Sequence, residues 1–215
     1  MKRTLLFLFC SMFVLAITAK TITPAASLPA YYEAIDGKSG KSLFDAVQKV
    51  TKTGYSSLGY DGLWAAYKYT DLYDNGYVWD MYSDCTWKSI NSNHCGNYSN
   101  ECDCYNREHS IPKSWYGGTT SGPGCDIFHL VPTDGKVNGI RSNYPFGEVG
   151  SADYNKHGNK RGSAKSITIT GGNTIAGNTG ATISASGTVF EPRDEYKGDF
   201  ARGYMGALLK WAGDK

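Results

Sequence analysis

A chain of 215 residues can bury one sizeable core and is shorter than two full domains usually require. Its 40% hydrophobic and 13% aromatic residues exclude a disordered chain. The formal net charge of +2 neither requires nor excludes a polyanionic partner, so the distribution of charge along the chain must decide that question.

The N-terminus has the plan of a secretory signal peptide. Lys2 and Arg3 precede a mostly apolar run over residues 5–19. A run of about fifteen residues falls short of the roughly twenty that a membrane span needs. We therefore expect residues 1–19 to be a signal peptide. Residues 20–215 would then form one domain that is secreted or periplasmic and not bound to a membrane.

Two helices and a strand are predicted next. Ser39 or Ser42 can cap a helix with apolar residues on one face, and Gly54 ends it. Residues 60–73 carry Tyr, Leu and Trp side chains at similar spacing and indicate a second helix, whose aromatic residues we assign to the core. Alternation in residues 77–84 predicts a strand.

The loop that follows is rich in cysteine. Without the signal peptide, five cysteines remain, namely Cys85, Cys95, Cys102, Cys104 and Cys125. An oxidising compartment favours disulfides, and an odd number leaves at least one thiol free or paired between molecules. The alternative is a structural zinc site built from His94, Cys95, Cys102 and Cys104, but their spacing lacks the usual paired knuckles. Disulfides are therefore favoured, with the connectivity open.

Residues 104–150 concentrate carboxylates, histidines, asparagines and arginines. Pro112 ends any regular element that includes Glu108 and His109. Thr133 or Asp134 can cap a short helix, and on this helix the side chains of Asn138 and Arg141 are three positions apart and share a face.

The C-terminal half adds a basic segment and a helix. Residues 154–190 contain no acidic residue, and four of their basic residues form a candidate surface for phosphate backbones: Lys156, Lys160, Arg161 and Lys165. A solvated hairpin is the alternative reading of this segment, within which residues 165–170 predict a strand. Asp199 can cap a helix that runs to Trp211. Together the elements indicate one loop-rich domain of mixed α+β class.

Three of these residues suit phosphodiester hydrolysis. The reaction needs a water, a base for its proton, and positive charge on the phosphate. His109 suits the base because an ordinary imidazole is mostly neutral at pH 7. Glu108 and Asn138 offer the hard oxygen ligands that Mg²⁺ prefers. Adjacent residues of an extended chain point in opposite directions, so Glu108 can address the metal while His109 addresses the water.

Three long motifs resemble, in order, those of the bacterial endonuclease I family: YNREHSIPKSW (105–115), DIFHLVPTDGKVNGIRSNYPFG (126–147) and VFEPRDEYKGDFAR (189–202). The resemblance implies an exported, disulfide-bonded nuclease that cuts DNA, and often RNA, with little sequence specificity. It also implies a ββα-metal (His-Me finger) site in which Glu108 and Asn138 bind Mg²⁺, or another divalent cation such as Mn²⁺ or Ca²⁺, and His109 is the general base. We expect a monomer.

The chain departs from the family pattern in its phosphate-clamping loop and at its C-terminus, and the role of His129 stays open. Some members clamp the scissile phosphate with an arginine in a long loop, whereas residues 113–124 are short here and contain Lys113 as their one basic residue. We therefore nominate Arg141 for this contact, with Lys113 as a further nucleic-acid contact. His129 can orient His109, line the site, or serve only the structure. Similar proteins continue beyond the position of Trp211, which implies a shortened C-terminal part.

Two other functions remain open. One is a zinc metallohydrolase using the four histidines, His94, His109, His129 and His157, although their spacing lacks the paired arrangement usual at such sites. The other is an exported nucleic-acid-binding module that keeps the motif without catalysis.

Overall fold

A computed structural model of the chain describes residues 32–87, 92–168, 182–183 and 186–213. The chain divides into residues 1–37 and 38–215, and the elements described below belong to the second part. The expected signal peptide, residues 1–19, lies outside the described residues. Over the described ranges, no helix is long and apolar enough to cross a membrane.

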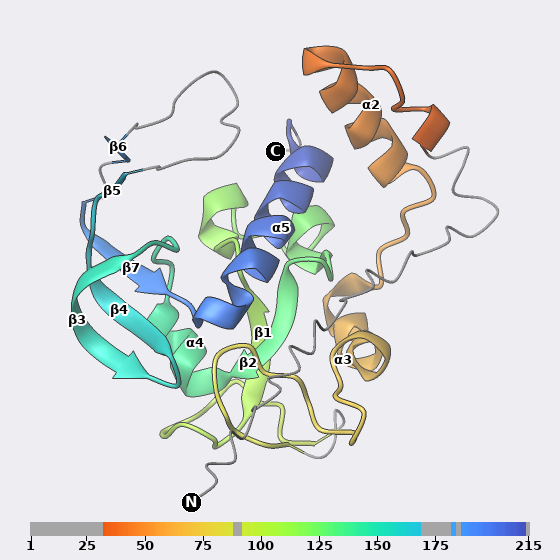
Figure 1. The fold of residues 1–215 in the computed structure, drawn as a ribbon. Helices are drawn as coiled ribbons and strands as arrows, with labels where there is room; N and C mark the ends of the chain where they lie inside the picture. Colours follow the sequence, from red (N-terminus) through yellow and green to blue (C-terminus); the bar gives the residue numbers. More distant parts are fainter. Residues whose placement is uncertain (1–31, 88–91, 169–181, 184–185, 214–215) are drawn as a thin grey trace, which may run out of the picture. The chain divides into compact units, whose positions relative to one another are not determined.

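The regular elements confirm the mixed α+β class. In chain order they are α2 (Gly40–Lys52), α3 (Gly59–Thr70), β1 (Tyr105–His109), η1 (Lys113–Tyr116), η2 (Gly122–Cys125), β2 (Leu130–Asp134), α4 (Gly135–Arg141), β3 (Val149–Lys156), β4 (Asn159–Ala164), β5 (Ile167–Thr168), β6 (Thr182–Ile183), β7 (Thr188–Glu191) and α5 (Asp194–Trp211). In the described part of the chain, β1 pairs with β2, β3-β4-β7 form a second antiparallel sheet, and β5 pairs with β6 (Figure 1).

Two hydrophobic clusters hold these elements together. The first joins α3 to the β1–β2 pair through Leu63, Tyr67, Val78, Cys85, Trp87, Tyr105 and Leu130. The second joins α4, β7 and α5 through Met81, Tyr82, Val137, Phe190 and Phe200. Segment 78–87 contributes to both clusters, so it links the packing around β1 and β2 to the packing around α4.

The two N-terminal helices are confirmed, and the C-terminal helix is longer than predicted. Helix α2 is followed by Gly54, whose φ of 72° is the left-handed conformation that glycine adopts readily. Helix α5 begins at Asp194 and not at Asp199, so that predicted start is wrong. Asp194 and Glu195 occupy its first turn, where carboxylates interact favourably with the helix dipole.

The segment predicted as a strand, residues 77–84, is irregular. Residues 80–83 are all buried, so the alternation of buried and exposed side chains is lost. The Asp80 carboxylate accepts hydrogen bonds from the backbone N–H groups of Tyr82 and Asp134 at 2.7 and 3.0 Å. The strand prediction is therefore wrong, because a local side-chain acceptor replaces the strand ladder and ties the segment to the start of α4.

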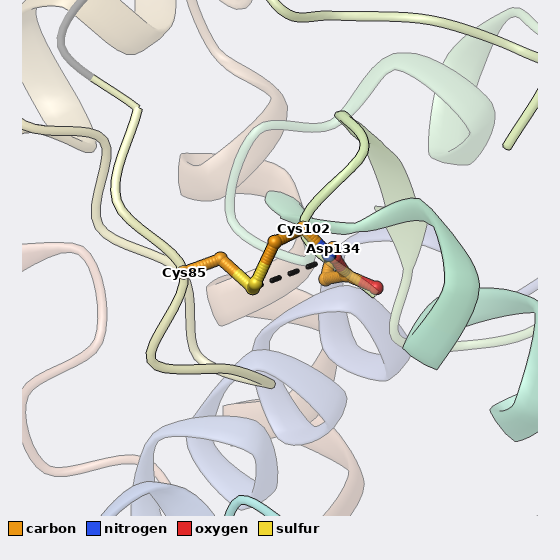
Figure 2. Close-up of side chains that lie close together, drawn as sticks. All are labelled: Cys85, Cys102 and Asp134. Carbon is orange, nitrogen blue, oxygen red and sulfur yellow. Dashed lines mark hydrogen bonds between the residues drawn. A yellow bond between two sulfur atoms is a disulfide. The ribbon is translucent and has the colours of Figure 1, made fainter. Parts of the chain in front are cut away.

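The expected disulfides are present. They join Cys85 to Cys102 and Cys95 to Cys104, and Cys125 is a buried free cysteine. Figure 2 shows the first disulfide beside the carboxylate of Asp134, which accepts a hydrogen bond from the backbone N–H of Cys102 at 2.6 Å. Although these three side chains lie close enough to share a metal, the two sulfur atoms are bonded to each other. Because they form disulfides, Cys95, Cys102 and Cys104 are also not available as ligands of the alternative zinc site.

Reduction of the two disulfides should lower the free energy of unfolding by about 2–4 kcal/mol for each bond, because a crosslink restricts the unfolded chain. Denaturant unfolding with and without a reductant measures the loss. In the unfolded, unreduced protein lacking residues 1–19, one thiol should react, namely that of Cys125. Five reactive thiols in that sample would contradict the pairing.

Burial of Asp71 at the end of α3 should make stability depend on pH. Burial raises the pKa of its carboxyl from 3.8 to about 6, against a hydrogen bond from the Thr70 hydroxyl. The stabilising contribution of the neutral acid is complete below pH 3.8 and is lost as the pH rises through about 6. The side chain of Asp71→Asn stays neutral. The free energy of unfolding of this variant should therefore rise by up to about 3 kcal/mol relative to that of the wild type between pH 4 and 7. Urea denaturation across this range measures the difference, and a constant difference would contradict the expectation.

Candidate active site

The β1–β2 pair and α4 form a ββα unit. The two strands are antiparallel, with His109 opposite Leu130, and α4 continues directly from β2 (Figure 1). The Asp134 side chain accepts a hydrogen bond from the backbone N–H of Val137 at 2.8 Å and so caps the helix. Of the two caps predicted from the sequence, the structure uses Asp134.

Helix α4 covers one face of β1. Side chains alternate along a strand, so Asn106 and Glu108 share a face and His109 lies on the other. Asn138 donates from Nδ2 to Asn106 Oδ1 at 2.7 Å, and Arg141 Nη1 lies 2.9 Å from Glu108 Oε1. The helix therefore brings Asn138 to the face of β1 that carries Glu108.

Glu108 and Arg141 form a buried ion pair. Their exposed fractions are 2% and 1%, and the Tyr82 hydroxyl donates to Glu108 Oε1 at 2.8 Å. Arg141 also donates to the backbone carbonyl oxygens of His109, at 2.8 Å, and Ser110. Burial raises the pKa of Glu108, whereas Arg141 and Tyr82 oppose this rise by stabilising the carboxylate. Arg141 thus holds the Glu108 side chain and the backbone at the end of β1 together.

His109 is a buried, neutral imidazole surrounded by aromatic rings. Burial lowers its pKa to about 4. Its Nε2 lies 3.3 Å from the carbonyl oxygen of Gly124, and because a carbonyl only accepts, this contact places the proton on Nε2 and the lone pair on Nδ1. The ring centroids of Tyr60, Tyr116 and His129 lie 5.7, 6.5 and 6.3 Å from that of His109. This environment favours the unprotonated form that a general base requires.

His129 lies beside His109 and contacts the same short turn. Its Nε2 donates to the carbonyl oxygen of Pro123 at 2.7 Å, next to the carbonyl that His109 contacts. Among the described residues its buried Nδ1 has no hydrogen-bond partner, and burial lowers the pKa of His129. His129 therefore helps to hold η2 against the site.

The other two histidines lie in different surroundings. The exposed His94 ring stacks on Trp64 with 4.3 Å between ring centroids. His157 lies between the carboxylates of Asp84 and Glu101, at 3.4 and 3.1 Å. Within the described ranges, the four histidines do not form a group that could share one metal. This arrangement disfavours the zinc metallohydrolase.

The predicted basic surface lies mainly on the hairpin of β3 and β4. Lys165 directly follows β4 and is exposed, whereas Lys113 belongs to η1. The other three basic side chains form ion pairs with carboxylates. Lys156 pairs with Glu101 at 3.4 Å, Lys160 with Glu191 at 3.2 Å, and Arg161 with Asp153 at 2.9 Å. Any phosphate that contacts these three side chains must compete with a carboxylate.

Sequence reasoning missed three residues of this site. Asn106 precedes Glu108 by two positions, so strand alternation alone would have placed it on the same face. Tyr82, which contacts Glu108, and Tyr60, which stacks on His109, come from distant parts of the chain. No local sequence signal connects those two residues to the motif.

Comparisons with known proteins agree with the motifs. The family model described as Endonuclease I matches residues 39–208. The chain is 32% identical over 200 residues to an extracellular ribonuclease of Bacillus amyloliquefaciens and 31% identical over 201 residues to one of Bacillus subtilis (strain 168). Each alignment covers 91% of this chain and 58% of the relative, so the chain spans less than two thirds of the length of these relatives.

No solved structure matches this chain significantly. The family model nevertheless covers more than half of the chain, including β1, β2 and α4. This chain therefore belongs to the endonuclease I family.

Proposed function

We propose that the chain is an exported, metal-dependent endonuclease that hydrolyses phosphodiester bonds in RNA and DNA with little sequence specificity. Membership of the endonuclease I family and the similarity to two extracellular ribonucleases support this function. The observation that carries it is the arrangement on β1, where Glu108 faces the helix of Asn138 and a neutral His109 lies on the opposite face. We further propose that the protein acts as a monomer outside the cytoplasm.

Glu108 and Asn138 fit a hard divalent cation, Mg²⁺ or alternatively Mn²⁺ or Ca²⁺. A carboxylate and an amide oxygen are ligands that such ions prefer. Asn138 uses Nδ2 to contact Asn106, which leaves its Oδ1 as the amide's ligand atom. Arg141 and Tyr82 fix the orientation of the Glu108 carboxylate. When bound, the cation would stabilise the negative charge that develops on the phosphate.

His109 would activate the attacking water. Its Nδ1 lone pair accepts a proton from the water as the water oxygen bonds to phosphorus and the bond to a bridging oxygen breaks. Gly124 holds the opposite nitrogen and thereby selects the tautomer with the lone pair on Nδ1. His129 would line this site from the side of η2.

We propose that Arg141 is a positioning residue. Its exposed fraction is 1%, and its guanidinium contacts Glu108 and two carbonyl oxygens at the end of β1. The interior position favours this role over the phosphate contact predicted from the sequence.

A digestion experiment tests the proposed function. Purified protein without residues 1–19 is incubated with plasmid DNA and with RNA, in Mg²⁺ and in excess chelator. We expect both substrates to degrade to smears in Mg²⁺ and to survive in chelator, with His109→Ala as a control that cuts far more slowly. Binding without cutting would instead support the nucleic-acid-binding module, and discrete bands would contradict low specificity.

The basic hairpin should contribute to binding through phosphate contacts. Neutralising its four cations together, Lys156, Lys160, Arg161 and Lys165, should make the slope of log K against log salt shallower by about 0.9 for each lost contact with duplex DNA. Binding is measured in the His109→Ala background over a salt series. Lys41→Gln is the control, because Lys41 lies on α2 and pairs with Asp45. An unchanged slope would show that this surface does not make the phosphate contacts.

A further inference from the structure

A cavity of about 350 Å³ lies beside the candidate active site. Its volume falls within the range of small-molecule pockets. It is lined by residues from α3, the cysteine-rich loop and β1, namely Tyr60, Trp64, His94, Cys95, Gly96, Asn106 and Arg107. The proposed catalytic roles do not account for this set of side chains.

The walls of the cavity are aromatic and cationic. The His94 and Trp64 rings are stacked, with 4.3 Å between centroids and an interplanar angle of 21°. The Arg107 guanidinium carbon lies 3.5 Å from the ring centroid of Tyr60 and 4.4 Å from that of Trp64. Arg107 is anchored by its contacts with the Tyr60 carbonyl and the Asp61 carboxylate, the latter at 3.2 Å. These contacts hold the guanidinium against both rings at the cavity.

Two wall residues also contact the candidate active site. Tyr60 stacks on His109, with 5.7 Å between ring centroids. Asn106 accepts the hydrogen bond from Asn138 at 2.7 Å. One cavity residue, Tyr60, therefore contacts the proposed base, and another, Asn106, contacts a proposed metal ligand.

We propose that this cavity is a nucleobase subsite, which holds the unpaired base of a nucleotide adjacent to the phosphodiester bond being cut. This inference rests on the proposed function. Aromatic rings and a guanidinium plane bind bases by stacking, and every base has a face that can stack, so such a site tolerates any sequence. A base inside a duplex is already paired and stacked, so the subsite would favour single-stranded substrates.

A comparison of two trinucleotides tests the subsite. One is a DNA trinucleotide of adenines, and in the other all three nucleosides are replaced by abasic tetrahydrofuran residues on the same phosphate backbone. Affinity is measured by calorimetry with the His109→Ala protein in excess chelator, conditions under which we expect no cleavage during the measurement. We expect the adenine trinucleotide to bind about 5- to 150-fold more tightly, the effect of stacking one base.

Variants of two cavity residues then test whether this preference arises in the cavity. His94→Ala and Trp64→Leu should reduce the ratio of the two affinities toward one while leaving the affinity for the abasic trinucleotide unchanged. Because Trp64 packs against the core, the exposed His94 provides a test that does not depend on the fold. Tyr69→Ala is the matched control, since Tyr69 lies on the same helix, is 90% exposed and does not line the cavity.

Equal affinity for the two trinucleotides in the reference protein would overturn the subsite and point to a phosphate contact alone. A preference that persists in both pocket variants would also overturn it. Cleavage of long RNA and plasmid DNA by the wild-type protein is measured in parallel. If the wild type cuts neither, the proposed function fails, whereas the trinucleotide ratio still decides whether the cavity binds a base.

Discussion

Replacing His109 with alanine should reduce single-turnover cleavage by a factor of about 10²–10⁴, the usual contribution of a general base, and leave the affinity for the divalent cation nearly intact. The neutral ring offers a lone pair on Nδ1, because Nε2 contacts the Gly124 carbonyl. Burial lowers the pKa of His109 to about 4, so the unprotonated imidazole predominates at neutral pH.

Two further variants separate the base from the metal ligands. Glu108→Ala and Asn138→Ala should weaken Mg²⁺ binding, and a higher Mg²⁺ concentration should restore part of the activity of Asn138→Ala. Single-turnover cleavage is followed over a Mg²⁺ titration, with metal binding measured independently. If His109→Ala lost metal affinity as severely as Asn138→Ala, His109 would be a ligand and not the base. If all three variants kept wild-type rates, the site would lie elsewhere.

Local chemistry explains which parts of the fold could be predicted. The cap at Asp134 and the helices α2 and α3 depend on residues that are close in the sequence, and these predictions are confirmed. Residues 77–84 were assigned by alternation, but Asp80 accepts a hydrogen bond from Asp134, more than fifty positions away. A pattern within eight residues contains no information about such a partner.

The same distinction applies to the candidate site. The motif on β1 gave Glu108 and His109, and helical spacing placed Asn138 and Arg141 on one face. Spacing does not determine burial, however, and an arginine suited to phosphate by its chemistry lies in the interior on Glu108. The basic hairpin shows the same limit, because two of its acidic partners, Glu101 for Lys156 and Glu191 for Lys160, lie outside the hairpin.

Replacing Arg141 with methionine should lower the free energy of unfolding by about 3–5 kcal/mol, because it leaves the Glu108 carboxylate buried without its cation. The backbone carbonyl oxygens of His109 and Ser110 also lose a donor. Lys41→Met is the matched control, since it breaks an exposed ion pair with Asp45 and should cost no more than about 1 kcal/mol. Denaturant unfolding compares the two variants.

Arg141→Lys distinguishes positioning from phosphate contact. A single ammonium group keeps the positive charge but cannot reproduce the planar set of donors that bridges Glu108 and the two carbonyl oxygens. As a positioning residue, Arg141 should therefore lose stability and turnover together in this variant, with little change in the affinity for nucleic acid. A phosphate clamp would show the reverse pattern, with weaker substrate binding and wild-type stability. Wild-type stability in Arg141→Met would likewise contradict the buried pair, because Glu108 is 2% exposed and Arg141 is its cationic partner.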